Sequence, residues 1–311
     1  MKKCLVLGGG GFLGSHACDA LLAHGYHLRI FEKLYVDREN VQHLISDVEW
    51  QEGDFTNESH LRDIVQGMDC IVHAIGTTLP KDSNENPAYD ISSNVISTLH
   101  LLNAAKEAGV RKIIFFSSGG TVYGIPRTVP ITEDHPTDPI SSYGIQKLTI
   151  EKYLHLYHRM HGIDYAVMRI SNPYGERQRP EASQGAVAVF LYHILRDEPI
   201  EIWGDGSVTR DYLHISDLAG VIPSLLTYEG KYKLFNISSG RGLSLLDMIR
   251  TFEKVTGRSV ELRFTPSRPF DVPVNVLDNT RARQELGWTP RVDFAQGVKR
   301  TLEYLSERLK A

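Results

Sequence analysis

Short apolar runs alternate with longer amphipathic stretches through the first half of the chain. Runs rich in β-branched and aromatic residues predict strands, and apolar residues at helical spacing predict helices between them. The predicted strands are Lys3–Leu7, His27–Phe31, Glu49–Gln51, Cys70–Ala74, Lys112–Ser117 and Tyr165–Ile170. The predicted helices are Phe12–Ala23, Ser59–Gln66, Pro87–Ala108 and Ser142–Met160. This alternation is typical of βα units, whose crossover helices join parallel strands.

After Asn172 the alternation ends, and short helices and strands are broken by proline and glycine. We predict an α/β fold with two domains: a Rossmann-like doubly wound parallel sheet over residues 1–170, and a smaller mixed α/β domain over residues 171–311. The chain is expected to cross between them, because no low-complexity linker separates them. Open α/β sheets bind ligands at the carboxyl ends of their strands, so we expect the ligand site there.

Composition narrows the class of partner. Hydrophobic residues make up 41% and charged residues 23% of the 311 residues, and the net charge is −4. This is the mix of a folded globular protein, and without basic runs it gives no electrostatic reason to expect nucleic acid. The odd number of cysteines (Cys4, Cys18 and Cys70) favours neither a disulfide framework nor a metal site, and it fits the cytoplasm. The apolar run at the start is too short for a membrane span.

The first candidate site is the glycine-rich segment Gly8–Gly14, which follows the first strand and opens a helix. Its glycines allow a tight turn in which backbone N–H groups approach a pyrophosphate at the positive end of the helix. Such a turn can also be an ordinary loop. Its place after the first strand favours a dinucleotide site formed by Gly8, Gly11, Phe12 and Leu13.

Glu32 stands just past the second predicted strand, where a carboxylate can accept hydrogen bonds from both ribose hydroxyls of NAD. The alternative is a solvated surface glutamate. The neighbouring Lys33 could tolerate a 2′-phosphate, so NADP is disfavoured but stays open. Asp54 follows the third strand, where it could either face the adenine or cap the next helix.

Tyr143 and Lys147 stand four residues apart at the start of a predicted helix, and that spacing places them on one face. A phenol acting as a base at neutral pH must lower its pKa from ~10 by about three units, or ~4 kcal/mol. Nearby positive charge can supply this, from Lys147 and from an oxidised nicotinamide ring. The alternative is a surface tyrosine beside a solvated lysine. Hydroxyl residues after the fifth strand could relay the proton, or could simply form a turn.

Together these segments resemble the extended short-chain dehydrogenase/reductase family of nucleotide-sugar enzymes, above all the UDP-glucose 4-epimerases. The resemblance covers nearly the whole chain. It is carried by Gly8-x-x-Gly11-x-x-Gly14, Gly53-Asp54, His73-Ala74, Ser117-Ser118-x-x-Thr121-Val122-Tyr123-Gly124, Tyr143-x-x-x-Lys147, Asn172-Pro173-Tyr174-Gly175, Gly204-Asp205-Gly206, Arg210-Asp211-Tyr212, Arg268-Pro269-x-Asp271 and Leu286-Gly287-Trp288-x-Pro290.

The resemblance implies NAD as cofactor, with further contacts from Asp54, Phe55, His73 and Ala74. In such epimerases the tyrosine removes the proton of the 4-hydroxyl while hydride passes to NAD, and the 4-keto sugar is then reduced on its other face. Tyr143 is thereby the expected base, and Lys147 lowers its pKa and holds the cofactor ribose.

The expected catalytic hydroxyl is less simply assigned. Counted back from Tyr123, the family's Ser/Thr position falls on Gly119, whereas counted forward along the strand it falls on Ser118. We assign the role to Ser118, with Thr121 as the alternative.

For the substrate, the resemblance assigns Asn172, Arg210 and Arg268 to the UDP phosphates, which suit guanidinium and amide donors. Trp203 matches a segment that lies along the uracil, although it could equally be a buried core tryptophan. Asp271 is expected near the hexose. Asn275 stands where glucose-specific members often have a bulky tyrosine, so we hypothesise that N-acetylated sugars are also accepted.

Other activities of this fold stay open to different degrees. A 4,6-dehydratase is disfavoured, because Gly119, Gly120 and Thr121 stand where that branch has an Asp-Glu pair. A uronic-acid 4-epimerase would need a grip on a carboxylate, from Thr78, Arg177 or Arg179. A non-catalytic dinucleotide-binding module would need neither Tyr143 nor Lys147.

The family commonly forms homodimers through two long helices. The corresponding stretches are 94–108 and 142–160, where Ile150, Tyr153, Leu154 and Tyr157 suit either a dimer or packing on the sheet.

Overall fold

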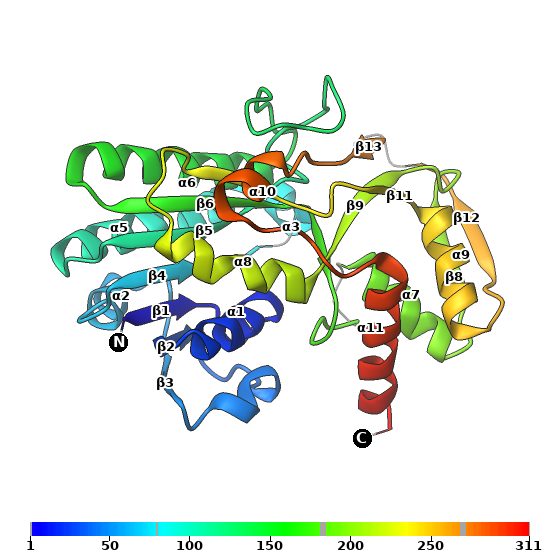
Figure 1. The fold of residues 1–311 in the computed structure, drawn as a ribbon, viewed down its shortest axis with the longest axis horizontal. Helices are drawn as coiled ribbons and strands as arrows, with labels where there is room; N and C mark the ends of the chain where they lie inside the picture. Colours follow the sequence, from blue (N-terminus) through cyan, green and yellow to red (C-terminus); the bar gives the residue numbers. More distant parts are fainter. Residues whose placement is uncertain (1, 79, 181–184, 268–271, 311) are drawn as a thin grey trace. The chain divides into compact units, whose positions relative to one another are not determined.

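The larger sheet contains the predicted parallel strands (Figure 1). The computed structural model describes residues 2–78, 80–180, 185–267 and 272–310, within which seven strands form this sheet in the order β10-β6-β5-β4-β1-β2-β3. Their bounds are β1 Lys3–Leu7, β2 His27–Glu32, β3 Val48–Glu52, β4 Cys70–His73, β5 Lys112–Ser118, β6 Asp164–Ile170 and β10 Leu234–Ile237. From β1 the chain first builds outward through β2 and β3, then returns to add β4 on the other side of β1. The carboxyl ends of β1 and β4 therefore flank the switch point at which such sheets bind ligands.

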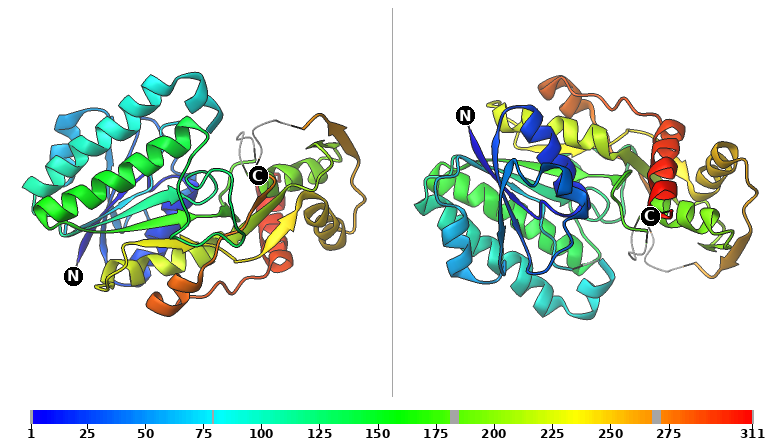
Figure 2. Two further views of the ribbon diagram at one scale, coloured as in Figure 1. Left: turned by 90° about the horizontal axis from the view of Figure 1, so that it is seen from above. Right: turned by 90° about the horizontal axis from the view of Figure 1, so that it is seen from below.

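Helices cover both faces of this sheet (Figure 2). Alternate residues of β1 point to opposite faces, and Leu5 and Leu7 join the core beneath α2, α5 and α6. Ile150 and Leu154 of α6 are buried in the same core, so these two residues pack on the sheet. The helical bounds in this part are α1 Phe12–Ala23, η1 Glu39–Leu44, α2 Glu58–Ile64, α3 Pro80–Glu85, α5 Ser97–Glu107, α6 Ser142–His161 and α8 Ile215–Thr227.

The prediction of a single α-helix over Pro87–Ala108 is wrong for the first half of that range. The structure has a short α4 at Pro87–Asp90, a π-helical segment at Ile91–Ile96, and then α5. Polar side chains here bond to backbone carbonyls of the helix itself, as Asn94 does to Asp90 O at 3.0 Å and Thr98 to Asn94 O at 2.7 Å. Such bonds compete with the regular backbone ladder, and π segments of this kind are frequent at functional sites.

The rest of the chain forms smaller sheets. In its described part, β11, β9 and β13 form a mixed sheet to which β7 is added by pairing with β9, and β12 pairs with β8. A second core surrounds Leu191, Ile202, Phe252 and Val298. The bounds are β7 Asn172–Tyr174, α7 Ala186–Leu195, β8 Ile200–Trp203, β9 Thr209–His214, β11 Gly242–Ser244, α9 Leu245–Thr256, β12 Leu262–Thr265, β13 Val274–Asn275, α10 Thr280–Leu286 and α11 Phe294–Arg308.

The described chain divides into two compact units, between which it passes several times. Unit 1 comprises Met1–Gly124, Pro136–Arg169 and Ala219–Phe235, and unit 2 comprises Ile125–His135, Ile170–Leu218 and Asn236–Ala311. None of the described helices is long and apolar enough to cross a membrane. Within the same residues, no group of three His, Cys, Asp or Glu side chains is arranged to hold a metal ion. Cys4, Cys18 and Cys70 are buried thiols.

Candidate functional site

The glycine loop after β1 is closely packed against its own backbone. Gly8 has a φ of +81°, and a Cβ at Gly14 would overlap the carbonyl oxygen of Gly8. Helix α1 can therefore start directly behind the loop, with Gly11 as its N-cap residue. Since Gly11 has no side chain to cover the first turn, the N–H groups at the positive end of α1 suit an anionic ligand such as a pyrophosphate. Phe12 and Leu13 form the partly buried first turn.

Glu32, at the end of β2, is buried and tied to this loop. Its Oε1 accepts from Gly10 N at 2.9 Å, and its Oε2 accepts from Lys33 N at 3.2 Å. Burial raises the pKa of Glu32, and these N–H groups oppose the shift. The alternative of a solvated surface glutamate is therefore wrong.

The other predicted cofactor residues follow β3 and β4. Asp54 is exposed and accepts from the N and Oγ1 of Thr56, both at 2.8 Å. The cap of α2 is Asn57, which removes the alternative role for Asp54. Phe55 is buried, with its ring 5.3 Å from that of His73. Ala74 is half-buried just beyond β4.

His73 is buried and is held in its neutral form. Its Nε2 lies 3.0 Å from Thr98 Oγ1, whose proton goes to Asn94 O. His73 therefore donates from Nε2. Burial, together with the charge of Lys147, lowers the pKa of His73 to about 3.

Tyr143 and Lys147 occupy the first two turns of α6 and face the same way, as their spacing predicts. The Lys147 Nζ lies 5.6 Å from the Tyr143 ring centroid and 4.8 Å from that of Phe115, and it donates to Phe116 O at 3.0 Å. Lys147 is 4% exposed and Tyr143 is half-buried. The alternative of a surface tyrosine beside a solvated lysine is therefore wrong.

The protonation of this pair is set by burial and by two carboxylates. Burial, with the nearby Asp90, raises the pKa of Tyr143 to about 12. Burial lowers the pKa of Lys147 to about 8, against the opposing charges of Asp90 and Glu151. At neutral pH the protein alone thus keeps the phenol protonated. Bringing that pKa to neutrality requires roughly 7 kcal/mol, more than the sequence argument implied, at about 1.36 kcal/mol per unit.

The two candidate hydroxyls lie at the end of β5. Ser118 is the last residue of the strand and is half-buried. Thr121 lies in the following turn, where its Oγ1 is buried and has no hydrogen-bond partner among the described residues. The assignment of the relay to Ser118 therefore stays a prediction, as does the alternative.

A set of buried polar residues near this site was not predicted. We call it the polar stripe: Asp90, Ser93, Asn94, Ser97 and Thr98. These residues are at most 3% exposed and recur at three- and four-residue spacing. That spacing was the available signal, because polar residues on the buried face of a helix need partners there. Thr78 donates to the Asp90 carboxylate. Its hydroxyl proton is thereby committed, which speaks against Thr78 as a donor to a uronate.

The predicted substrate residues of unit 2 have distinct surroundings. Trp203 is 43% exposed, so the alternative of a buried core tryptophan is wrong. Asn172 donates to Asp211 O at 3.1 Å, and Arg210 donates to Thr209 O at 3.0 Å and Val272 O at 2.6 Å. Asn275 is buried opposite Arg210 in the β9–β13 register. Arg268 and Asp271 lie outside the described residues.

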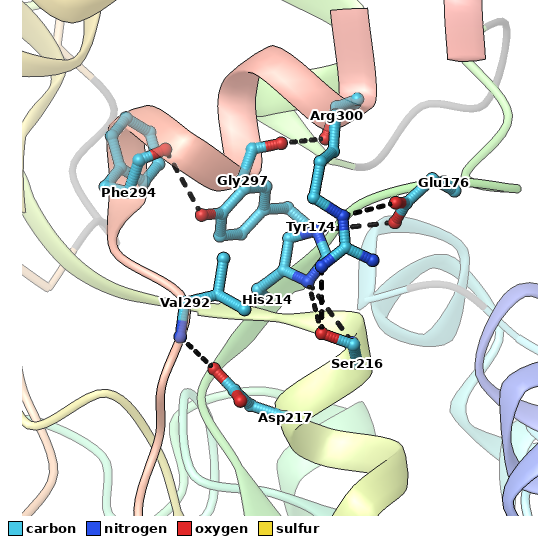
Figure 3. Close-up of polar contacts among 10 residues, drawn as sticks. Tyr174, Glu176, His214, Ser216, Asp217, Val292, Phe294, Gly297 and Arg300 are labelled. Carbon is cyan, nitrogen blue, oxygen red and sulfur yellow. Dashed lines mark hydrogen bonds and ion pairs between the residues drawn. The ribbon is translucent and has the colours of Figure 1, made fainter. Parts of the chain in front are cut away.

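Unit 2 also holds a charged cluster that the sequence did not reveal (Figure 3). The Glu176 carboxylate lies 2.9 Å from Arg300 Nε and 3.3 Å from His214 Nε2. The His214 Nδ1 lies 2.9 Å from Ser216 Oγ. Burial alone would raise the pKa of Glu176, but His214 and Arg300 lower it to about 2. We call these four residues the Glu176 cluster.

The larger sheet and its glycine loop define a dinucleotide-binding protein of the Rossmann type, and comparison with known proteins identifies the family. Residues 4–238 match the NAD dependent epimerase/dehydratase family. The UDP-glucose 4-epimerase of Mycolicibacterium smegmatis is 33% identical over 98% of this chain and 99% of that protein. The dTDP-4-dehydro-6-deoxyglucose reductase of Escherichia coli is 33% identical over 96% of each. The structure of the Thermotoga maritima UDP-glucose 4-epimerase with UDP-glucose matches with a TM-score of 0.92 at 35% identity, over 99% of both chains. The chain therefore belongs to the NAD-dependent epimerase/dehydratase family, as the sequence resemblance predicted.

Proposed function

We propose that this protein is an NAD-dependent UDP-hexose 4-epimerase that acts through a transient 4-keto sugar. The observation that carries the proposal is the Tyr143–Lys147 pair, with Lys147 buried and its Nζ 5.6 Å from the phenol ring, in a chain of this family. The 33% and 35% identities to UDP-glucose 4-epimerases over nearly the full length support the same activity.

In this proposal the cofactor is held mainly by unit 1. The proposed contacts are Gly8, Gly11, Phe12, Leu13, Glu32, Asp54, Phe55, His73, Ala74, Tyr143 and Lys147. When bound, NAD supplies reversible hydride acceptance at the sugar C4. The buried acceptor Glu32 and the uncovered first turn of α1 are suited to a ribose and a pyrophosphate.

Tyr143 is the proposed base for the 4-hydroxyl, with Ser118 as the relay and Thr121 as the alternative. Lys147 holds its positive charge beside the phenol, although its own pKa of about 8 leaves that charge sensitive to mildly alkaline pH. Because the pKa of Tyr143 is about 12 in the protein alone, the oxidised cofactor is expected to contribute much of the remaining positive potential.

Unit 2 is proposed to bind the UDP moiety. Asn172, Arg210 and Arg268 are the candidates for the phosphates, and the exposed ring of Trp203 for the uracil. Asp271 is proposed to contact the hexose. We retain the hypothesis that Asn275 allows N-acetylated sugars.

Two other activities and one non-catalytic role compete with this proposal. A nucleotide-sugar reductase is favoured by the 33% identity to the Escherichia coli enzyme. A UDP-glucuronate 4-epimerase would now depend on Arg177 and Arg179. A non-catalytic dinucleotide-binding module would bind NAD without turnover.

One experiment separates these activities. The purified protein is incubated with NAD and, in separate reactions, with UDP-glucose, UDP-N-acetylglucosamine and UDP-glucuronate, and each is followed by NMR for its C4 epimer. The epimerase proposal expects interconversion without net change in nicotinamide absorbance. In a further reaction that contains reduced cofactor and a nucleotide-linked 4-keto sugar, a reductase would consume the reduced cofactor in proportion to that sugar. Bound NAD without any epimer would contradict the proposal.

We also propose a homodimer in the cytoplasm. Apolar side chains remain exposed on α6 and the π-helical segment, including Ile145, Leu156, Met160, Ile91 and Ile96. Exposed apolar residues that gather on neighbouring helices favour an interface. Sedimentation of the protein and of a Leu156→Glu, Met160→Glu double variant would test it, since only the former should sediment as a dimer.

A further inference from the structure

The first turn of α6 is held by side chains rather than by the helix alone. Ser142 N donates to Asn84 Oδ1 at 2.9 Å, and Tyr143 N donates to Ser83 Oγ at 3.1 Å. Gly144 N donates to the N-cap residue Ser141 at 3.2 Å. The first N–H groups of a helix have no partner within it, so these bonds determine how the helix begins. The backbone that carries Tyr143 is thus tied to the segment between β4 and α4.

Asp90 adds a buried charge to the same place. Its side chain is fully buried, and its Oδ2 accepts from Ser142 Oγ at 2.8 Å. Its Oδ1 accepts from Thr78 Oγ1 and from Asn94 Nδ2, the latter at 3.1 Å. A buried carboxylate is stable only when such donors surround it. One side chain therefore joins the loop after β4, the π-helical segment and the first residue of α6.

The charge of Asp90 also acts on the pair that follows in α6. Burial raises the pKa of Tyr143, and Asp90 raises it further. Burial lowers the pKa of Lys147, and Asp90 and Glu151 oppose that change. His73 of β4, whose pKa is lowered by burial and by the charge of Lys147, stays neutral. Asp90 thus favours the charged form of Lys147 while disfavouring the phenolate.

We propose that Asp90 is a positioning residue for the reaction proposed above: through Ser142 its carboxylate holds the first turn of α6, and so Tyr143, in place beside Lys147. The proposal rests on the epimerase function. A residue needed only for folding would affect the whole protein alike. Asp90, in contrast, should affect the position of Tyr143 through its bond to Ser142, and the pKa of Tyr143 through its charge.

Asp90→Ala and Ser142→Ala separate the two effects. Ser142→Ala removes the link to α6 and keeps the charge, whereas Asp90→Ala removes both. Asp63→Ala, the same substitution at an exposed position of α2, is the matched control. We measure kcat and KM on the UDP-hexose that the wild type epimerises. We also follow the ionisation of Tyr143 by NMR of protein with isotope-labelled tyrosine rings, assigning the signal with Tyr143→Phe.

We expect Asp90→Ala and Ser142→Ala to lower kcat about tenfold or more with little change in KM, as a misplaced reacting group does. Only Asp90→Ala should shift Tyr143 ionisation to lower pH. Turnover then falls although the phenol ionises more easily, a combination that neither a folding role nor a purely electrostatic role gives. The proposal is overturned if both variants keep kcat within about twofold of the wild type, or if Asp90→Ala leaves the ionisation unchanged.

A failure of the Asp90 proposal can be distinguished from a failure of the epimerase proposal. If the wild type epimerises no UDP-hexose, the function fails, and the ionisation measurement alone decides the influence of Asp90 on Tyr143. If Asp90→Ala does not fold, the kcat of Ser142→Ala decides whether the first turn of α6 is held through this bond.

Discussion

Two carboxylates, Asp90 in unit 1 and Glu176 in unit 2, are stabilised in opposite ways. In unit 1, Asp90 is fully buried and bonded to neutral donors from Thr78, Asn94 and Ser142. In unit 2, the side chain of Glu176 is 21% exposed and is paired with Arg300 and His214. A charge surrounded by neutral donors still acts on its neighbours, whereas a paired charge is largely cancelled. If the proposed function holds, the chemistry depends on residues of unit 1 beside Asp90, and unit 2 serves mainly to bind the substrate.

Tyr143→Phe offers the strongest test of this division. If the chemistry depends on the phenol of unit 1, turnover of the UDP-hexose should fall by roughly 10³-fold while the fold is kept. Turnover is measured by NMR of the epimer formed, and the fold is checked by circular dichroism. Tyr35→Phe, at an almost fully exposed position, is the control and should be fully active. An active Tyr143→Phe enzyme would place the chemistry elsewhere.

A methyl group in the glycine loop should have the next largest effect. Gly14→Ala would overlap the Gly8 carbonyl, and overpacking of this kind costs about 2 kcal/mol, or roughly thirtyfold in NAD affinity. Calorimetric titration with NAD measures the affinity. In Gly220→Ala, where the added Cβ meets no atom within 4 Å, affinity should not change. Equal affinities for the two variants would argue against the loop as the cofactor site.

Trp203→Ala tests unit 2 as a binding scaffold. Loss of the exposed ring should raise KM for the UDP-sugar by about tenfold and leave kcat nearly unchanged, since the interaction is equal in ground and transition states. Phe264→Ala removes a ring that is 56% exposed on the neighbouring strand β12 and should change neither constant. A fall in kcat alone for Trp203→Ala would break the division between the units.

Acid should begin to destabilise the two units at different pH values. His73 has a pKa of about 3 in the fold against 6.5 when unfolded, so only the unfolded chain takes up this proton in between. The contribution of His73 to the free energy of unfolding is therefore complete above about pH 6.5, and about 2 kcal/mol of it is lost by about pH 5. Glu176, with a pKa of about 2 against 4.5, contributes stability that is lost only as the pH falls below about 4.5.

Urea unfolding across this pH range measures both contributions. His73→Gln should flatten the dependence between about pH 6.5 and 4.5, and Glu176→Gln should flatten it below that. His24→Gln, at an exposed histidine, should follow the wild type. If the His73→Gln variant loses as much stability as the wild type between about pH 6.5 and 4.5, His73 is not held neutral in the fold.

Local sequence signals predicted the first βα unit with its residue bounds. Lys3–Leu7 and Phe12–Ala23 agree with the structure because the glycines end one element and open the next. The Tyr143–Lys147 spacing also gave the correct helix face. The family resemblance, confirmed by the comparisons, named the class of protein that these local patterns alone could not.

The features of the site that could not be predicted from the sequence depend on contacts between distant segments. Asp90 looked like an ordinary helix residue because Thr78 and Ser142, which bond to it, lie far away in the chain. The burial of Glu32 and the exposure of Trp203 likewise follow from packing. The charge pair of Glu176 and Arg300 joins residues more than a hundred positions apart.

The π-helical segment Ile91–Ile96 restricts which insertions and deletions this helix can tolerate. A π turn contains one residue more than an α turn, and each residue of an α-helix turns the chain by about 100°. Deleting one residue here would restore the regular ladder but rotate Asp90 by that angle relative to Leu101 and Leu102, which anchor α5 in the core. The carboxylate would leave Ser142 even though no polar residue had been lost. Changes of helix length in this segment should therefore be as damaging as substitution of Asp90 itself.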